Sequence, residues 1–321
     1  MEGDVDEDRA GGVLLGAACG DALGVPYEFG ARLSADETPE MIGGGLGPYA
    51  PGEYSDDTQM AVCVAEVMAS GGDLDAEEAL DAVALNFLRW CREGAGDIGV
   101  QTGRVLNAAM AADGPPARRL REAAAGLHRV TGLSAGNGSL MRTGPVGLAA
   151  LGDPVKTARV ARAVSSLTHF DDLAGDACVI WCEGIRRAVT EGTLSGVRGG
   201  LELVPAERRG RWAGWLDAAE ENPPWHFSPN GFVVPALQAA WSAVSRAATG
   251  RTAGARGLRA AVEDAVRAGH DTDTVAAIAG ALAGAYWGAG DVPREWREAV
   301  HGWPGVRGDE LAGMGVRAAG G

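Results

Sequence analysis

Long alanine- and leucine-rich segments with a helical spacing of apolar residues are the feature that most restricts the fold of this chain. Apolar residues recur about every 3.6 positions in each of these segments, which predicts helices with one apolar face. Glycine, proline and aspartate separate the segments, and the alternation typical of strands is almost absent. The sequence therefore predicts an all-α fold. The clearest segments are residues 77–91, 154–167, 175–189 and 236–248.

Two segments also carry glycine at every fourth position. A stripe of glycines on one face would let two helices approach closely. The alternative is coincidence, because a chain with 50 glycines produces some such spacings by chance. One series is Gly12, Gly16, Gly20 and Gly24, and the other is Gly280, Gly284 and Gly288.

The length of 321 residues allows one large domain or two ordinary ones. We expect one domain, over residues 11–310, because the irregular stretches are too short and too unbiased to be domain linkers. An acidic, disordered N-terminus is expected at residues 1–10 and a flexible tail at residues 311–321. The irregular stretches are residues 31–53, 131–137 and 220–231.

Charge and composition argue against several classes of protein. A formal net charge of -15 disfavours broad binding to DNA or RNA. The longest small and apolar run, residues 275–290, is shorter than the roughly 20 residues of a membrane span, so we expect a core helix there and no membrane association. The five cysteines form no C-x-x-C pair, and the acidic N-terminus does not resemble a signal peptide. These features predict a cytoplasmic protein with buried free thiols. A monomer or homodimer is expected, and the sequence does not choose between the two.

Two short segments combine paired carboxylates with hydroxyl side chains directly before a helical segment. Helix capping explains one such segment, but a cap does not need two acids with hydroxyls at each of two helix starts. Sets of oxygen ligands select hard cations such as Mg²⁺ or Mn²⁺. The segments therefore predict two divalent cations, about 3.5–4 Å apart, whose charge offsets the carboxylates. The segments are Ser55, Asp56, Asp57 and Thr58, and Asp271, Thr272, Asp273 and Thr274.

Two further motifs have physical interpretations of their own. The glycine- and asparagine-rich segment 136–142 is typical of a turn that presents backbone N–H groups to phosphate, although an ordinary Asn-Gly turn would look the same. Asp171, Asp172 and Asp176 are explained by capping and by the first turn of the helix predicted at 175–189, so we leave them out of the site.

Five motifs in this chain resemble, in order, those of the ADP-ribosylglycohydrolase family, and the resemblance spans about residues 11–290. It implies a compact, orthogonal bundle of helices with a binuclear Mg²⁺ or Mn²⁺ site that hydrolyses the bond between ADP-ribose and an acceptor. The default substrate is an ADP-ribosyl-arginine on a protein; serine, a nucleobase and O-acetyl-ADP-ribose are the other acceptors considered. The motifs are residues 12–29, 54–60, 136–148, 168–178 and 269–285.

The same resemblance implies roles for individual residues. Glu28 or Asp57 would act as the general base toward water, and the sequence does not choose between them. His270 stands where the family commonly has glycine, which could alter substrate choice. The implied metal ligands are Ser55, Asp56, Asp57, Asp271, Asp273, Thr274 and Glu28. The implied substrate-binding residues are Asp97, Gly99, Ser134, Gly136, Asn137, Gly138, Ser139, Leu140 and His169.

Two other functions are considered. An isoprenoid synthase is also all-helical and binds Mg²⁺ through aspartates, but the first segment has Met60 where a third acid is needed, and 6% aromatic residues leave little to line a carbocation cavity. A non-catalytic relative that binds ADP-ribose, or serves a structural role, would keep the same fold. Every expected metal position retains an oxygen ligand, which argues against that loss of activity.

Overall fold

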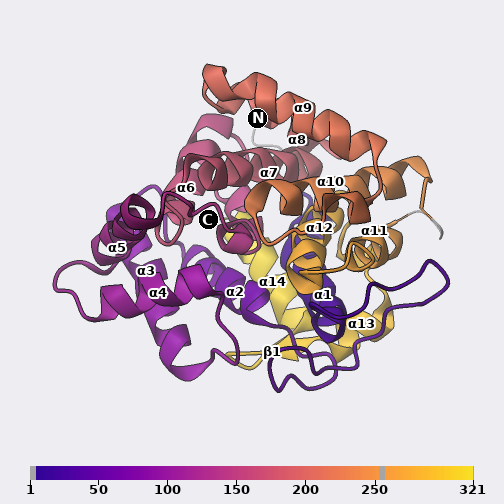
Figure 1. Ribbon diagram of the computed structural model, residues 1–321, viewed down its shortest axis with the longest axis horizontal. Coiled ribbons are helices and arrows are strands. Elements are labelled where there is room, and N and C mark those ends of the chain that lie inside the picture. Colours follow the sequence, from indigo (N-terminus) through magenta and orange to yellow (C-terminus); the bar gives the residue numbers. More distant parts are fainter. Residues whose placement is uncertain (1–4, 253–256, 321) are drawn as a thin grey trace.

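The computed structural model describes residues 5–252 and 257–320, which form a helical body with one minimal pair of strands (Figure 1). The all-α prediction is confirmed, and the four segments predicted from periodicity lie within α3, α6, α7 and α10. The strands β1 and β2 pair antiparallel. The elements are α1 Glu7–Gly24, α2 Asp56–Ala69, α3 Glu77–Glu93, α4 Val100–Met110, α5 Pro116–Thr131, α6 Pro154–Ser166, α7 Asp172–Glu191, α8 Gly196–Gly199, α9 Ala206–Glu221, α10 Val233–Thr249, α11 Leu258–Val266, α12 Thr272–Trp287, α13 Arg294–Ala299, β1 His301–Gly302, β2 Val306–Arg307 and α14 Gly308–Ala319.

The helices α1 and α12 pack with their backbones in direct contact at the centre of the molecule (Figure 1). A Cβ atom on Gly16 would collide with the carbonyl of Gly280, and a Cβ atom on Gly280 would collide with the carbonyl of Gly16. Gly12 and Gly284 exclude side chains from each other in the same way. The glycine stripes thus allow the close approach that their spacing predicted. Gly288 plays another part, since it follows the end of α12 with a φ of 89°.

Helix α14 packs against α1 and α2, at the position where the sequence analysis expected a flexible tail. Leu311 and Met314 are buried, which gives this segment an apolar face that a free tail would not need. At the other end of the chain, α1 begins at Glu7, and Asp6 caps it by accepting a hydrogen bond from the backbone N–H of Arg9. Parts of both predicted disordered termini are therefore helical.

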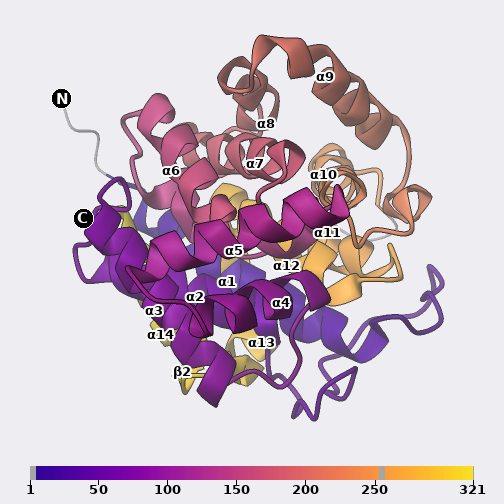
Figure 2. The same cartoon turned by 60° about the vertical axis from the view of Figure 1, so that its left-hand side comes forward.

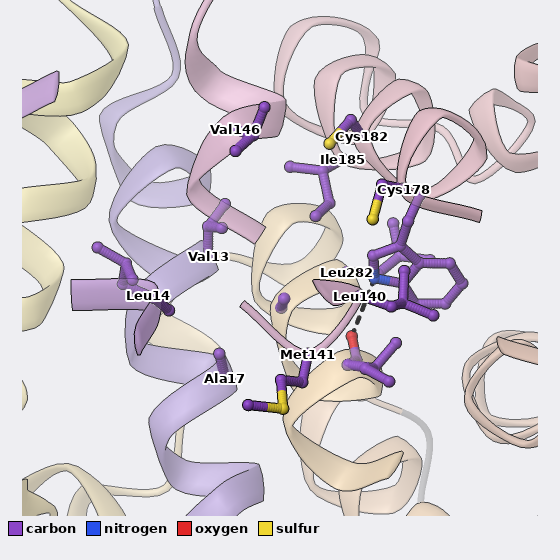
Figure 3. Close-up of a cluster of buried hydrophobic side chains, with 14 of the residues drawn as sticks. Val13, Leu14, Ala17, Leu140, Met141, Val146, Cys178, Cys182, Ile185 and Leu282 are labelled. Carbon is purple, nitrogen blue, oxygen red and sulfur yellow. Dashed lines mark hydrogen bonds between the residues drawn. The ribbon is translucent and has the colours of Figure 1, made fainter. Parts of the chain in front are cut away.

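The core continues from α1 through the segment after the Asn-Gly turn to α7, as Figure 3 shows for side chains that include Val13, Met141 and Ile185. Among them are two buried thiols of α7, Cys178 and Cys182. All five cysteines are free, as predicted, and four of them are buried. Residues 132–136 and much of 31–53 form loops. Helix α9 lies at the outer edge of the molecule in both views (Figure 1; Figure 2). None of the described helices is both long and apolar enough to cross a bilayer.

Candidate active site

The end of α1 and the beginnings of α2 and α12 meet at a cavity of about 340 Å³. The last residue of α1 explains why they can come so close: a Cβ atom on Gly24 would collide with the backbone of Asp273. The two acidic segments, residues 55–58 and 271–274, therefore meet at this cavity although they lie near opposite ends of the chain. Five of the predicted site residues on this side line it: Glu28, Asp56, Asp271, Asp273 and Thr274.

The carboxylates form two overlapping groups of three. Ligand oxygens of Asp21, Asp57 and Asp273 lie within 4.8 Å of one another, and so do those of Glu28, Asp271 and Asp273. Asp273 belongs to both groups. A carboxylate shared in this way has two oxygens and so could contact two neighbouring cations. Asp56 lines the cavity but belongs to neither group.

Burial raises the pKa of all of these acids, and neighbouring carboxylates raise some of them further. For Glu28, burial together with the charge of Asp271 raises the pKa to about 8. For Asp56, burial together with the charge of Asp21 also raises the pKa to about 8. Burial and the adjacent charges hold the pKa of Asp57 and of Asp273 well above the ordinary range. Burial likewise raises the pKa of Asp21 and of Asp271. The protein alone thus does not supply enough positive charge for these acids to ionise normally.

The chemistry of this donor set fits hard divalent cations. Oδ1 of Asp57 is buried and has no hydrogen-bond partner among the described residues. Both groups of three consist of carboxylates, without cysteine or histidine, and the hydroxyl of Ser55 lies 3.0 Å from Oδ2 of Asp57. Divalent cations would give the orphaned oxygen a partner and would offset the charges that now disfavour ionisation. The residues present therefore fit Mg²⁺ or Mn²⁺.

Asp21 is the member of the cluster that the sequence analysis missed. Its Oδ1 accepts hydrogen bonds from the backbone N–H of Ser55 at 2.9 Å and from the Ser55 hydroxyl at 2.8 Å. Its Oδ2 accepts from the backbone N–H of Thr58 at 3.0 Å and from the Thr58 hydroxyl at 2.6 Å. An acid of α1 thereby holds the first turn of α2. The signal available in the sequence was a single charged residue inside an otherwise apolar, glycine-striped helix.

The opposite wall of the cavity comes from the Asn-Gly turn. Gly136, Asn137 and Gly138, which the sequence predicted to bind substrate, line the cavity. The Asn137 side-chain amide donates to Oδ2 of Asp271 at 2.7 Å, so the turn is tied directly to the acidic wall. The turn itself includes a short 3-10 helix over Asn137–Ser139.

Three other predicted substrate-binding residues are buried and do not line the cavity. The Ser139 hydroxyl accepts a hydrogen bond from Ser165 at 3.0 Å. The Ser134 hydroxyl lies 2.6 Å from Nδ1 of His128. Leu140 belongs to the core. Their side chains thus hold the turn from behind.

The remaining predicted contacts lie around the rim and floor. Asp97, Gly99 and His169 line the cavity. His270 is exposed and has a φ of 67°; its backbone carbonyl accepts a hydrogen bond of 2.6 Å from the N–H of Phe29, and the two rings meet edge to face at 5.0 Å. Phe29 itself lines the cavity. The imidazole of His270 therefore does not line the cavity, but it contacts the ring of Phe29, which does. Other lining residues that the sequence analysis did not select include Leu46, Val100, Gln101, Thr102, Met141 and Gly231.

Comparisons with known proteins identify the family of this chain. A family model described as ADP-ribosylglycohydrolase matches residues 2–319. An ADP-ribosylarginine hydrolase of Pseudomonas putida (strain GB-1) is 32% identical over 91% of this chain and 74% of its own length. An ADP-ribosyl-dinitrogen reductase glycohydrolase of Rhodospirillum rubrum is 27% identical over 92% of this chain and 91% of its own. A solved structure described as an ADP-ribosylglycohydrolase-related protein complex is 30% identical, with a TM-score of 0.71 and 98% of both chains covered. This chain belongs to the ADP-ribosylglycohydrolase family.

Proposed function

We propose that this hydrolase cleaves the glycosidic bond between ADP-ribose and an acceptor, with ADP-ribosyl-arginine on a protein as the first substrate to test, and that it uses two Mg²⁺ or Mn²⁺ ions. The observation that carries the proposal is the pair of carboxylate groups that share Asp273 in one cavity. Neither a capping role nor the packing of α1 on α12 requires such a cluster. The family membership disfavours the isoprenoid synthase alternative.

The two carboxylate groups divide the ligands between two ions. Asp57 and Asp273 would hold one ion beside Asp21, whose oxygens bind Ser55 and Thr58, and Glu28, Asp271 and Asp273 would hold the other. The hydroxyls of Ser55 and Thr274 and the carboxylate of Asp56 are the further oxygen donors proposed for this wall. Bound there, such ions would supply Lewis-acid chemistry by polarising water and sugar hydroxyls.

Glu28 is the better placed of the two candidate bases. It lines the cavity and is half-buried, so that its carboxylate can reach water inside the cavity. Asp57 is 1% exposed and does not line the cavity. Glu28 would therefore take a proton from the attacking water. Asp97, on the lining of the same cavity, would assist the departing acceptor, and the concentration of carboxylates would favour the positive charge that develops on the sugar during cleavage.

The Asn-Gly turn would hold the diphosphate and distal ribose of the ligand. Gly136 and Gly138 have no side chains to block the approach of phosphate, and His169 lies next to both. Ser134, Ser139 and Leu140 would act by supporting the turn, because their side chains are buried away from the cavity. A cavity of about 340 Å³ is within the ordinary range for small-molecule sites.

Arginine is the acceptor to test first because two relatives are named for it or for a protein substrate. One is an ADP-ribosylarginine hydrolase, and the other acts on ADP-ribosylated dinitrogen reductase by its name. The expected partner of this chain is accordingly an ADP-ribosylated protein.

The test is a panel of ADP-ribosyl conjugates of arginine, serine, a nucleobase and acetate, incubated with the protein with and without EDTA. The intact chain should release ADP-ribose from at least one conjugate, and EDTA or Asp273→Ala should abolish release. Asp172→Ala is the matched control, because Asp172 is also a first-turn acid but lies on α7 and does not line the cavity. Binding of ADP-ribose without cleavage of any conjugate would favour the non-catalytic alternative. Release that survives both EDTA and Asp273→Ala would refute the metal-dependent mechanism.

A further inference from the structure

Arg142 is a fully buried cation behind the Asn-Gly turn, and none of the described carboxylates pairs with it. Its guanidinium donates to the carbonyl of Gly138 at 3.3 Å and to the carbonyl of Val164 at 3.3 Å, and it lies 4.6 Å from the ring centre of Phe87. Burial lowers its pKa to about 10, so it is still charged at neutral pH. A buried charge held by carbonyls, a hydroxyl, the thioether of Met60 and an aromatic face is costly to keep. Because this burial costs free energy, we expect the charge of Arg142 to have a function.

The shortest contact of Arg142 is with a hydroxyl. Nη2 of Arg142 lies 2.7 Å from Oγ1 of Thr168. A guanidinium can only donate, so the hydroxyl oxygen must accept this hydrogen bond. The hydroxyl proton of Thr168 then has to go elsewhere, and within the described part of the chain the one acceptor in reach is Nδ1 of His169 at 2.8 Å.

This arrangement determines the protonation of the imidazole. If Nδ1 of His169 accepts from Thr168, the ring proton of the neutral histidine is on Nε2. Burial and the neighbouring Arg142 hold the pKa of His169 well below its ordinary range, which keeps the ring neutral. The ring lines the cavity, and Nε2 has no hydrogen-bond partner among the described residues. It lies beside the glycines of the turn, where a Cβ atom on Gly136 or Gly138 would come within 3.3 Å of it.

We infer that Arg142 and Thr168 are positioning residues that lock His169 in the Nε2-protonated tautomer, so that it presents a neutral N–H donor to a ligand oxygen in the cavity. The chain of contacts runs from the Arg142 guanidinium to the Thr168 hydroxyl and then to the ring. A neutral donor suits an oxygen that accepts hydrogen bonds, as in phosphate or a sugar hydroxyl, and it neither gains nor loses a proton at neutral pH. Only the identity of the ligand rests on the proposed function.

The direct test is the tautomer itself, measured on the free, intact protein. Long-range ¹H–¹⁵N correlation of the imidazole resonances should show His169 with a protonated Nε2 and an unprotonated Nδ1 at neutral pH. A protonated Nδ1, or a doubly protonated ring, would overturn the inference without reference to any substrate.

Two variants and a control separate positioning from packing. Thr168→Val keeps the shape of the side chain but removes the hydroxyl; it should give a mixture of His169 tautomers and weaken ADP-ribose binding about tenfold. Thr168→Ser restores the hydroxyl and should restore both the single tautomer and the affinity. Thr157→Val is the matched control, because Thr157 is also buried and its hydroxyl donates to the carbonyl of Ala150 at 3.0 Å, on a helix that does not line the cavity. It should change neither property.

The outcomes distinguish this inference from the proposed function. Failure of the intact chain to bind ADP-ribose, measured by calorimetry, would count against the proposed ligand, while the tautomer spectra would still decide the role of Arg142 and Thr168. If Thr168→Val keeps a single Nε2-protonated tautomer, or if Thr168→Ser fails to restore it, the positioning role is wrong.

Discussion

The two walls of the cavity carry unbalanced charge of opposite sign. The wall built from α1, α2 and α12 gathers acids whose pKa values are raised, such as Asp273, and one oxygen of Asp57 there has no partner in the part of the chain that the structure describes. The wall built from the Asn-Gly turn has the buried cation Arg142 behind it and the neutral ring of His169 on its surface. One wall is suited to cations and the other to hydrogen-bond acceptors.

The contrast shows how one small cavity can accept a ligand that carries both sugar hydroxyls and phosphates. A cation on the acidic wall could bind the hydroxyls of a sugar, and the donors of the opposite wall could bind phosphate oxygens. The amide of Asn137 joins the walls through its hydrogen bond to Asp271 and so sets their spacing. Because the two walls would bind different parts of the ligand, a substitution in one wall should leave the properties of the other wall unchanged.

The largest effect is expected from Asp273→Asn, which alters the carboxylate shared by both groups. Removing its charge should lower hydrolysis at least about 100-fold, since even residues that merely support a metal ligand contribute 10–100-fold. The chelated variant should nevertheless unfold at a higher temperature than the chelated parent, because one buried repulsive charge is gone. Activity and thermal unfolding, each with Mg²⁺ and with EDTA, check both expectations. Lower stability of the chelated variant would contradict the charge imbalance assigned to this wall.

The next effect is expected from Asp21→Asn, which removes the acid that holds the first turn of α2. An amide cannot accept on both of its atoms, so at least two of the four donors from Ser55 and Thr58 lose their partner. We expect a loss of about 1–3 kcal/mol in stability and a 10–100-fold loss in Mg²⁺ affinity. Denaturant unfolding and metal titration by calorimetry measure the two. The His169 tautomer should not change, and a change there would show that the walls are not independent.

The sequence was sufficient for features whose signal is local or periodic. The helices followed from apolar spacing, and the two acidic segments were recognisable because each concentrates acids and hydroxyls within four residues. The two glycine stripes predicted close helix packing, and in the structure the two helices that carry them, α1 and α12, pack against each other. Such features can be predicted because neighbouring residues carry all of the information.

The features that were missed depend on contacts between distant segments. In the sequence Asp21 is an isolated charge, and its role depends on its hydrogen bond to Thr58 of α2. Thr168 is likewise an ordinary polar residue in the sequence, and its role depends on its hydrogen bond from Arg142. The segment of helix α14 was expected to be a flexible tail, and its burial against α1 becomes visible only in three dimensions. Buried polar networks of this kind join segments that no local pattern connects.

A smaller effect is expected from Gly24→Ala compared with Gly12→Ala. Both glycines lie on the stripe of α1, and a Cβ atom on either would collide with backbone of the opposing segment. Both changes should cost roughly 1–3 kcal/mol of stability through overpacking. Only Gly24 faces the backbone of Asp273, so only Gly24→Ala should also lower Mg²⁺ affinity, by about tenfold. Equal losses of affinity in the two variants would show that the acidic wall responds to the helix pair as a whole.

The remaining prediction concerns the slope of stability against pH. The raised pKa values of Glu28 and Asp56, both about 8, mean that the folded, metal-free protein holds protons that the unfolded chain has already released above pH 4 to 5. The stability of the chelated protein should therefore be highest near pH 5 and fall toward pH 8, by about 1.4 kcal/mol per pH unit for each extra proton held. Saturating Mg²⁺ should remove this fall, since a bound cation favours the ionised carboxylates, and Asp273→Asn should weaken it in the chelated protein. Denaturant unfolding at several pH values measures the slope, and a chelated protein whose stability rises from pH 5 to pH 8 would mean that these acids are already balanced by charges of the protein itself.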